Sequence, residues 1–568
     1  MRFDLTRPGL GLKVLAGALI GTLALFVASQ SGKAASAVGC DPAALATAID
    51  AANSNPDATE LQLAKGCVYT LGSRNNSFYG FNGLPTITSP VTIVGNGATI
   101  QRDPGAPSFR IVSVDTTGSL RLIGVNLHNG LAKGGNGGSD RGNTDDGGGG
   151  GGGAGLGGAI YNRGALTVSV STISANTAQG GNGGDGAENT GEDGGGGAGG
   201  GGLGGNGGNS GAANIGDGGA GGGGMGGNGG AVQTGPEVYA GAGGGGTVSD
   251  GGSNSGEAPG AGGNANGGNG GAAELDGTAG GFGGGGGGGG DEGSGGAGGI
   301  GAGGGGAGEN DEESIPTFGG AGGFGGGGGG GGEDGTGGTG GFGGGGGGSS
   351  SDNTTGPLGG GTGGFGGGNG GAVSDTNSGG GGGAGIGGAI FNDGGTVTLI
   401  NSTLASNSVL GGQGGSGETP AQNGTAGQGI EPGVFNYGTG QVFALSGTCK
   451  GKPATIVGTP AADIVLGTAA ADVFVGGAGN DRFTGGAGND VACGGPGKDS
   501  LFGQAGKDTL LGQAGPDLLN GGAAKDLLIG GKGGDKLKGG GGKGDTCRGQ
   551  AGKDVEARSC ELPKAKKK

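Results

Sequence analysis

Aspartate recurs every nine residues through the last fifth of the chain, and these carboxylates are the side chains whose spacing most clearly points to chemistry. The series starts at Asp463, runs at nine-residue intervals to Asp535, and resumes after one additional residue at Asp545 and Asp554. Glycines keep the same period, and an apolar residue follows each aspartate from Asp463 to Asp545 by two positions, so the unit is GGxGxDxUx, in which U is apolar. A fixed repeat of this length over about eleven units predicts a solenoid.

The residue types of this unit suit a calcium site. Glycine permits the positive φ angles of tight turns and leaves carbonyl groups uncovered, and one carboxylate per turn adds an anionic oxygen. Ca²⁺ takes about six to eight oxygen ligands. We therefore expect Ca²⁺ as the cofactor, bound by Asp472, Asp481, Asp490, Asp499, Asp508, Asp517, Asp526 and Asp535. The alternative is a calcium-free β-solenoid, in which the strict phase of a residue that is unfavourable in strands has no cause.

The repeats resemble the hemolysin-type RTX calcium-binding repeats, most clearly in the two GGAGND units that end at Asp481 and Asp490. The resemblance implies a parallel β-roll in which two nine-residue units make one full coil and calcium lies between successive turns. Alternate aspartates then form two rows: Asp472, Asp490, Asp508 and Asp526 in one, and Asp481, Asp499, Asp517 and Asp535 in the other.

Several units depart from the family pattern. Lysine precedes the aspartate in later units, at Lys498, Lys507, Lys525 and Lys553. Other residues replace glycines of the motif: Gln504, Gln513 and Gln550 at position two, and Ala524 at position four. Between Cys449 and Cys560 the chain has 12 acidic and 13 basic residues, so this region is nearly neutral. We expect weaker calcium binding, and folding that depends less on calcium, than in strongly acidic repeats.

Composition and the N-terminus indicate an exported protein. About one third of the 568 residues are glycine without a Gly-X-Y period, and the net charge of −17 disfavours nucleic acid or an anionic membrane as a partner. A positive start, an apolar run over 14–28 and the small residues Ala35-Ser36-Ala37 predict a signal peptide at 1–37, with an uncleaved anchor as the alternative. We expect no membrane span after its removal, and a secreted or extracellular location, with cell-surface association as an option.

The six cysteines agree with export, because an even number in a secreted chain favours disulfides. Their placement suggests three local pairs, Cys40 with Cys67, Cys449 with Cys493, and Cys547 with Cys560. Six cysteines allow fifteen connectivities, so this pairing is a hypothesis.

We expect an all-β chain. The strand pattern predicts a right-handed parallel β-helix in two parts, residues 38–178 and 387–446. A short helix at 41–53 precedes strands with period-two alternation. The stretches 157–176 and 387–407 align with each other, and 433–445 is a weaker copy, which places Asn162, Asn392 and Asn436 in register, and likewise Asn176 and Asn407. These repeats resemble the pectin-lyase-like β-helix and the repeats of polymorphic outer-membrane proteins. Unrelated short strands are the alternative.

Residues 179–386 form a Gly-rich, acidic, low-complexity insertion in this β-helix, with GGFGGG recurring around Phe282, Phe324, Phe342 and Phe365. Glycine loses the most conformational freedom on ordering and has no side chain to bury, which favours a flexible, solvated insertion. A packed bundle of left-handed polyglycine helices is the alternative, because bare backbones can approach closely. The calcium-binding β-roll follows at 447–560, and a basic tail occupies 561–568.

No constellation of catalytic residues stands out. The single histidine, His128, follows Leu127, which we expect in the core, so His128 should point to solvent. Arg110 and Arg121 could face outward, but they lack an evident partner. We therefore expect a non-enzymatic, secreted or cell-surface calcium-binding protein with a structural or adhesive role and, besides calcium, an envelope or matrix polysaccharide as a candidate partner. The alternatives are a lyase-like or epimerase-like β-helix enzyme that acts on polysaccharide, with an RTX accessory module, and a purely structural wall protein.

Overall fold

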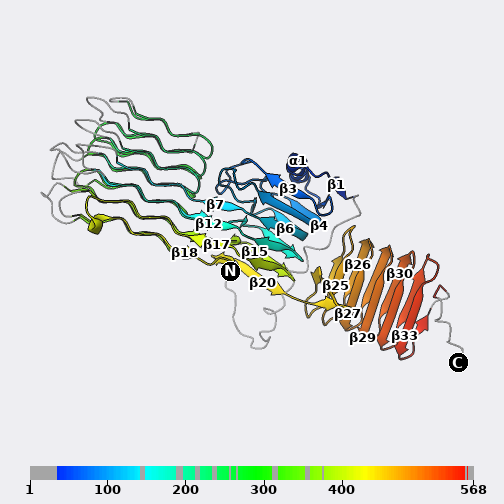
Figure 1. Ribbon diagram of the computed structural model, residues 1–568. Helices are drawn as coiled ribbons and strands as arrows, with labels where there is room; N and C mark the ends of the chain where they lie inside the picture. The colour runs from blue at the N-terminus through cyan, green and yellow to red at the C-terminus, as the bar shows by residue number, and fades with distance from the viewer. Residues whose placement is uncertain are drawn as a thin grey trace, which may run out of the picture.

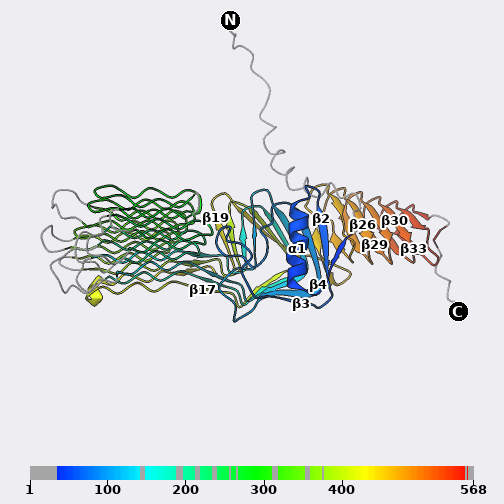
Figure 2. The same ribbon diagram turned by 90° about the horizontal axis from the view of Figure 1, so that it is seen from above.

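The computed structural model describes residues 35–140, 147–186, 196–210, 218–232, 240–254, 258–263, 266–309, 317–351, 358–373, 377–556 and 559–560. Three units follow one another along an elongated molecule: a Gly-rich bundle, a β-helix and a narrower coil that we call the roll (Figure 1; Figure 2). Named strands pair in parallel throughout the described ranges, except β21 (Thr448–Cys449) with β22 (Lys452–Pro453). A nearly all-β chain with a parallel β-helix and a β-roll is thereby confirmed.

The β-helix consists of one large sheet and three small ones. The large sheet contains β1 (Ser36–Val38), β2 (Thr59–Leu63), β3 (Val68–Leu71), β4 (Pro90–Arg102), β6 (Ser119–His128), β10 (Ala165–Ser169), β11 (Thr172–Ser174), β15 (Thr396–Ile400), β16 (Thr403–Ala405) and β20 (Gln441–Leu445). The small sheets are β5 (Val112–Val114), β9 (Ile160–Asn162), β14 (Ile390–Asp393) and β19 (Val434–Tyr437); β7 (Leu131–Lys133), β12 (Thr177–Gln179) and β17 (Ser408–Leu410); and β8 (Gly155–Leu156), β13 (Gly385–Ile386) and β18 (Gly429–Ile430).

The N-terminal helix covers the first coil of the β-helix. Helix α1 (Pro42–Asn53) begins after Asp41, whose carboxylate accepts the N–H groups of Ala43 and Ala44, and it buries Leu45 and Ile49 against the core. Capping by aspartate and proline in the first turn are the signals that predicted it. The long strand β4 follows without interruption from Pro90 to Arg102, and Ile87 before it contributes only an isolated bridge.

The predicted asparagine registers are confirmed as hydrogen-bonded ladders. Asn162 donates to Asn392 over 2.6 Å, and Asn392 donates to Asn436 over 2.6 Å. Asn176 donates to Asn407 over 3.0 Å. Each amide also caps nearby backbone carbonyls. The stacked amide N–H groups therefore satisfy backbone carbonyls at two corners of successive coils, while Oδ1 of Asn162 is buried without a hydrogen bond.

The predicted signal peptide lies mostly outside the described residues, but its predicted end does not. Ser36–Val38 forms β1, which pairs with β2 through Ser36 and Leu61. Cleavage after Ala37 would therefore cut a strand of the first coil. None of the described helices has the length and apolar character needed to cross a membrane.

Three successive coils of the β-helix open at the same corner into Gly-rich excursions. The chain leaves after β7, β12 and β17 and returns at β8, β13 and β18, so the excursions span 134–154, 180–384 and 411–428. The three excursions run side by side: Gly181 donates to Gly153, and Gly412 to Gly383. A short 3₁₀ helix, Pro420–Gln422, lies in the third. The Gly-rich unit thus includes two segments besides the predicted insertion at 179–386.

Backbone hydrogen bonds in the bundle repeat every three residues. In the segment 197–203, every third N–H group donates to a carbonyl of the same neighbouring segment. The N–H groups of Gly197, Gly200 and Leu203 donate to 301–307. Those of Ala198 and Gly201 donate to 148–151, and those of Gly199 and Gly202 donate to 205–208. Its carbonyls accept from three further segments, 135–138, 220–223 and 327–330. Three residues per turn is the period of the polyproline II helix. The segment is therefore surrounded by six hydrogen-bonded neighbours, with its backbone donors and acceptors satisfied between chains.

This packing explains the glycine content and corrects the flexible insertion that single-chain entropy favoured. A Cβ atom on Gly199, Gly200 or Gly201 would overlap a carbonyl oxygen of a neighbouring segment. The interior runs, such as 284–290 and 344–348, are buried. The structure thus agrees with the alternative of a packed polyglycine bundle, because hydrogen bonds to many neighbours offset an entropy cost that one isolated chain cannot recover.

Aromatic residues of the GGFGGG turns join the bundle to the β-helix. Phe324 stacks on Phe342 with ring centroids 5.0 Å apart, and Phe342 stacks on Phe365 at 5.2 Å. Against them lies a second ladder formed by the β-helix residues Tyr79, Tyr161, Phe391 and Phe435. The glycine after each turn phenylalanine has a positive φ, for example 81° at Gly325. Each Phe-Gly pair therefore makes one tight turn and contributes one ring to the junction.

The roll contains two parallel six-stranded sheets around a single apolar column. One sheet consists of β23 (Ile456–Val457), β25 (Val473–Val475), β27 (Val491–Pro496), β29 (Thr509–Ala514), β31 (Leu527–Lys532) and β33 (Thr546–Ala551). The other consists of β24 (Ile464–Leu466), β26 (Arg482–Ala487), β28 (Ser500–Ala505), β30 (Leu518–Ala523), β32 (Lys536–Gly540) and β34 (Val555–Glu556). The apolar residue of each repeat points inward, so that one residue per unit fills the column from Ile456 to Cys547.

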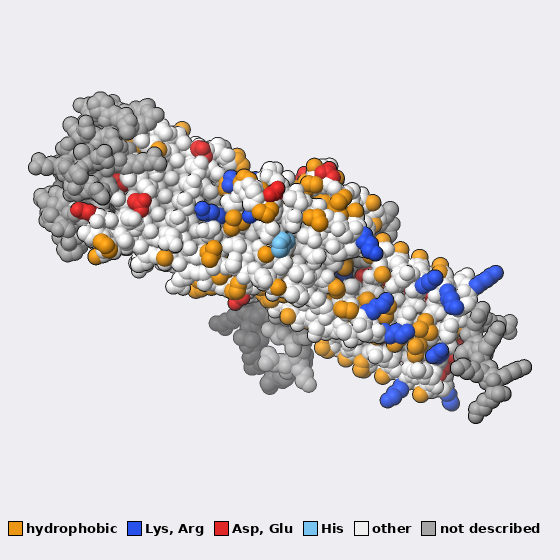
Figure 3. All heavy atoms as spheres, in the orientation of Figure 1, with side chains coloured by type: hydrophobic (Ala, Val, Ile, Leu, Met, Phe, Trp, Pro, Cys, Tyr) orange, Lys and Arg blue, Asp and Glu red, His pale blue; other side chains and the backbone are white. Residues whose placement is uncertain are grey.

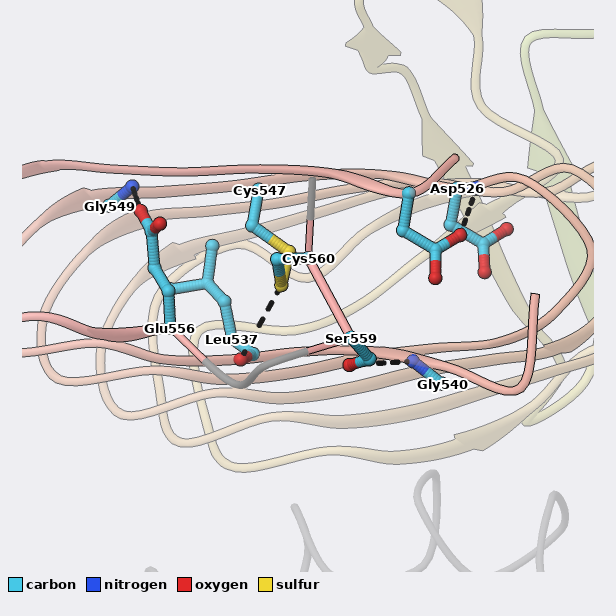
Figure 4. The surroundings of a disulfide bond; sticks show 9 residues. Asp526, Leu537, Gly540, Cys547, Gly549, Glu556, Ser559 and Cys560 are labelled. Carbon is cyan, nitrogen blue, oxygen red and sulfur yellow. Dashed lines mark hydrogen bonds between the residues drawn. A yellow bond between two sulfur atoms is a disulfide. The ribbon is translucent and has the colours of Figure 1, made fainter. Parts of the chain in front are cut away.

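All three predicted disulfides are present, and two of them fix the ends of the roll. Cys449–Cys493 fastens the entering chain to β27. Cys547–Cys560 closes the far end of the apolar column, where Ser559 also accepts the N–H of Gly540 (Figure 4). Hydrogen bonds from Ser169 to Thr455 and from Asn401 to Ala454 join the first coil to the β-helix. The apolar core of the roll is therefore closed at both ends.

We expect Gly201→Ala to destabilise the bundle by about 1–3 kcal/mol, because its Cβ would overlap the carbonyl oxygen of Gly135 and force two packed chains apart. Amide hydrogen exchange of the full chain should show faster exchange over 197–203. Gly359→Ala is the matched control, since nothing lies within 4 Å of its Cβ position, and its effect should stay within about 0.5 kcal/mol. Full exchange of 197–203 in the wild type within seconds would contradict a packed bundle.

Candidate calcium site

The aspartates of the repeats stand in two rows, one on each side of the roll, as predicted. In one row the Oδ1 of each aspartate accepts the backbone N–H of the aspartate 18 residues earlier, as Asp490 does from Asp472 at 2.8 Å and Asp508 from Asp490 at 2.9 Å. The other row repeats the pattern from Asp481 to Asp499 and on to Asp517. These carboxylates are buried, with at most 2% of each residue exposed from Asp472 to Asp545. One oxygen of each thus holds neighbouring coils together.

The second carboxylate oxygen has no partner in most of these repeats. Oδ2 is buried and without a hydrogen bond at Asp481, Asp490, Asp499, Asp508, Asp517, Asp526, Asp535 and Asp545. A buried anionic oxygen without compensation is strongly unfavourable. The repeat thus presents one such oxygen at every turn, which calls for a cation or a proton.

The first glycine of each repeat makes room for this oxygen. A Cβ atom at Gly485 or Gly503 would overlap Oδ2 of the aspartate five residues later, and the same overlap holds in every unit from Gly476 to Gly549. The glycine at position four of the repeat has a positive φ. Its Cβ position is occupied by a carbonyl oxygen of the preceding coil, as for Gly497, where the oxygen belongs to Gly479. Carboxylate and carbonyl oxygens therefore gather at the stacked turns.

The first two units differ, which alters the predicted ligand set. Threonine occupies the place of the second glycine there: Thr459 donates its N–H and hydroxyl to Oδ2 of Asp463, and Thr468 donates to Asp472 at 2.6 and 2.9 Å. The Oδ2 atoms of these two aspartates are satisfied, so we do not place Asp472 among the ligands. Asp545 was not among the predicted ligands because an additional residue interrupts the count, yet its Oδ2 is unpaired. The resumed nine-residue spacing was the signal for it.

Burial raises the pKa values of the row carboxyls. Desolvation is the largest cause; the backbone N–H that each accepts lowers the pKa, and neighbouring aspartates raise several of them further. The pKa of Asp490 rises to about 8, that of Asp517 to about 7, and those of Asp481 and Asp526 to about 6. Asp499, Asp508 and Asp535 also have raised pKa values. The anionic rows therefore lack enough protein donors to hold their charge.

The donor set fits Ca²⁺. Within the described residues, no three carboxylate, imidazole or thiolate side chains converge on one point, so an ion here must also use backbone carbonyls. Mixed carboxylate and carbonyl shells of hard oxygen are what Ca²⁺ accepts. The residues that would hold it are the eight aspartates with an unpaired Oδ2, together with the glycine carbonyls of their turns.

Residues that replace the turn glycines leave the roll strained. Gln504, Gln513 and Gln550 have φ angles of 75°, 79° and 77°, and Ala524 has 74°. Non-glycine residues in this left-handed region cost of order 1 kcal/mol or more each. These turns keep the positive φ angles of the glycine turns although the residues are not glycine, where the repeat departs from the GGxGxDxUx pattern.

The other residues considered for chemistry belong to the β-helix. His128 lies on the outer side of β6 next to the buried Leu127, as expected, and is half-buried beside Ser174, whose hydroxyl is 3.2 Å from Nδ1. Arg110 is buried, with 2% exposed, and donates to carbonyls of Tyr79 and Leu156, so the expectation that it faces outward is wrong. Desolvation by burial lowers the pKa of the Arg121 guanidinium, and the nearby charges of Asp472 and Glu60 offset part of this effect.

We expect calcium-free protein to be more stable at pH 5 than at pH 8.5 in the roll. Folded pKa values of about 6 to 8 lie above the unfolded value near 3.9, so proton binding favours the folded roll at low pH, and this stabilisation is lost as pH rises through the folded pKa values. Thermal unfolding in chelator, followed by circular dichroism, measures it. Calcium affinity should rise over the same range, because Ca²⁺ competes with these protons; a calcium-free stability that rises steadily with pH would contradict the assignment.

Comparison with known families agrees with this geometry. The model of the RTX calcium-binding nonapeptide repeat, which represents four copies, matches residues 457–492, 494–519 and 520–555. No curated protein and no solved structure matches the chain, so the likeness of the β-helix to pectin-lyase-like proteins stays a prediction. The C-terminal roll of this chain is built of RTX calcium-binding repeats, and Ca²⁺ is the ion that they bind.

Proposed function

We propose that this protein is an exported structural component in which calcium stiffens one end of a rigid molecule. The observation that supports this most directly is the series of eight buried Oδ2 atoms without a partner. Calcium bound at these oxygens would neutralise charges that otherwise oppose folding. A ligand that binds only the folded state stabilises it by mass action, by about 2.7 kcal/mol per site at a hundred times Kd.

Export would change how many of the calcium sites are filled. Extracellular calcium modules work at Kd values of about 10⁻⁴–10⁻³ M, so millimolar calcium outside a cell fills sites that stay empty in the cytosol. Three disulfides support an oxidising compartment. The folded roll would therefore be least stable before export and most stable afterwards, when calcium is bound. Three units of closely stacked backbone support a structural or adhesive role for this protein at the cell surface or in the matrix.

An enzyme that acts on polysaccharide, with the roll as accessory module, remains the second hypothesis from the sequence. Nothing in the geometry of the described residues favours it: Arg110 is engaged inside the β-helix, and Arg163, Tyr79 and Asp393 satisfy one another on its side. Release of unsaturated or epimerised products from uronate polymers by the purified protein would favour that hypothesis over ours.

Removal of two charges from one row tests the calcium role. Asp499→Asn/Asp517→Asn keeps an Oδ1 acceptor for the N–H of the preceding coil but removes the unpaired anionic oxygens. At pH 8 in chelator the variant should be at least as stable as wild type, and in millimolar calcium it should gain clearly less stability. Thermal unfolding and calcium titration of the full chain provide both measurements.

Asp50→Ala is the control, because Asp50 is exposed on α1 and far from the turns. It should match wild type in both conditions. Equal calcium-induced stabilisation of the wild type and the double variant would rule out the rows as the calcium sites.

A further inference from the structure

The roll has opposite charges inside and outside. Its ten aspartates from Asp463 to Asp545 are buried, with at most 6% of each residue exposed. The ten basic residues between Asp463 and Asp554 are all exposed: Arg482, Lys498, Lys507, Lys525, Lys532, Lys536, Lys538, Lys543, Arg548 and Lys553. In Figure 3 lysine and arginine side chains project all over the visible face of the roll. A repeat that is nearly neutral by count therefore presents a cationic surface.

The ten basic residues of the roll form no ion pairs within the described part of the chain. Among the described residues the ion pair within 4.0 Å is that of Arg163 with Asp393 in the β-helix, and none involves the ten basic residues of the roll. Arg482 lies over the ring of Phe502, with 4.7 Å from Cζ to the ring centroid. The exposed side chains of the described roll are thus mostly cationic, and the aspartates that oppose them are buried beneath the surface.

The Gly-rich bundle at the other end of the molecule has the complementary charge. Its three segments, 134–154, 180–384 and 411–428, contain 24 acidic residues and one basic residue. Exposed acidic side chains in its described part include Asp185, Asp250, Glu274, Asp276 and Glu418. The bundle and the roll lie on opposite sides of the β-helix (Figure 1), so one molecule presents an anionic end and a cationic end.

We propose that the cationic surface of the roll binds the acidic Gly-rich bundle of a second copy, so that molecules associate head to tail. Opposite charges at opposite ends make this contact between different surfaces, which does not close on itself and extends into linear polymers. Contact between two identical ends would instead bring like charges together. A second copy is favoured over a foreign polyanion because the matching acidic surface belongs to the same chain.

The strength of the contact should depend on salt and on calcium. A single exposed ion pair contributes about 0–1 kcal/mol, so several pairs must act together, and salt weakens them as the Debye length falls below about 10 Å. The calcium dependence rests on the function proposed above. Calcium on the buried aspartates removes their negative field, which leaves the lysines of the roll unopposed and should strengthen association several-fold.

Charge exchange tests the contact in the full chain. Lys536→Glu/Lys538→Glu on the roll and Glu274→Lys/Glu418→Lys on the bundle should each weaken self-association at least about tenfold, as measured by sedimentation velocity at low salt. An equimolar mixture of the two variants should recover association, because each supplies the wild-type surface that the other lacks. Lys65→Glu/Lys133→Glu on the β-helix changes the net charge equally and should leave association unchanged.

Circular dichroism and calcium titration check that every variant is folded and loaded. The proposal is overturned if the wild type stays monomeric at low salt, if about 0.5 M NaCl leaves association unchanged, or if the roll variant associates as well as the β-helix control. It is also overturned if large complexes form only on addition of polygalacturonate or duplex DNA, which would assign the surface to a foreign polyanion. A chain that binds no calcium yet associates as described would refute the proposed function and support the head-to-tail contact.

Discussion

Close approach of neighbouring backbones determines the architecture, because each unit satisfies its peptide groups by stacking one turn of chain directly on another. In the β-helix this stacking uses ordinary parallel strands and asparagine ladders such as Asn162, Asn392 and Asn436. In the bundle the chains surround one another without side chains between them, which only glycine permits. In the roll the same constraint appears at Gly497, where the preceding coil occupies the space of a Cβ. Glycine content thus reflects packing at short range rather than flexibility.

The same stacking creates the chemistry of the roll. A turn that repeats every 18 residues places each aspartate directly over another, and Oδ1 is used to hold the next coil. The apolar column beside it and the glycine at the start of the unit leave Oδ2 buried without a protein donor. Structural demand and ion binding therefore come from one side chain. The exclusion of lysines from this interior, and their placement on the outer surface, follow from the same geometry.

Much of the roll could be predicted from sequence because its period is strict. Nine-residue spacing predicted a solenoid, and the resemblance to RTX repeats implied the two rows of aspartates. The placement of the cysteines suggested the pairs that the structure contains. The bundle was harder, since its stability comes from hydrogen bonds between segments that are far apart in sequence, such as 197–203 with 301–307. The entropy cost of ordering one glycine chain does not include the hydrogen bonds that six neighbouring segments supply. The different state of Asp472 was visible only in Thr468, a substitution whose donor role becomes clear once the turn is folded.

Location of bound calcium in crystals of the full chain grown with millimolar Ca²⁺ tests the central claim most directly. The account predicts ions along both edges of the roll, each within about 2.3–2.6 Å of an Oδ2 between Asp481 and Asp545, and none at Oδ2 of Asp463 or Asp472, where threonine donates. Calcium bound elsewhere, or rows that stay free of metal while the aspartates remain buried, would contradict it.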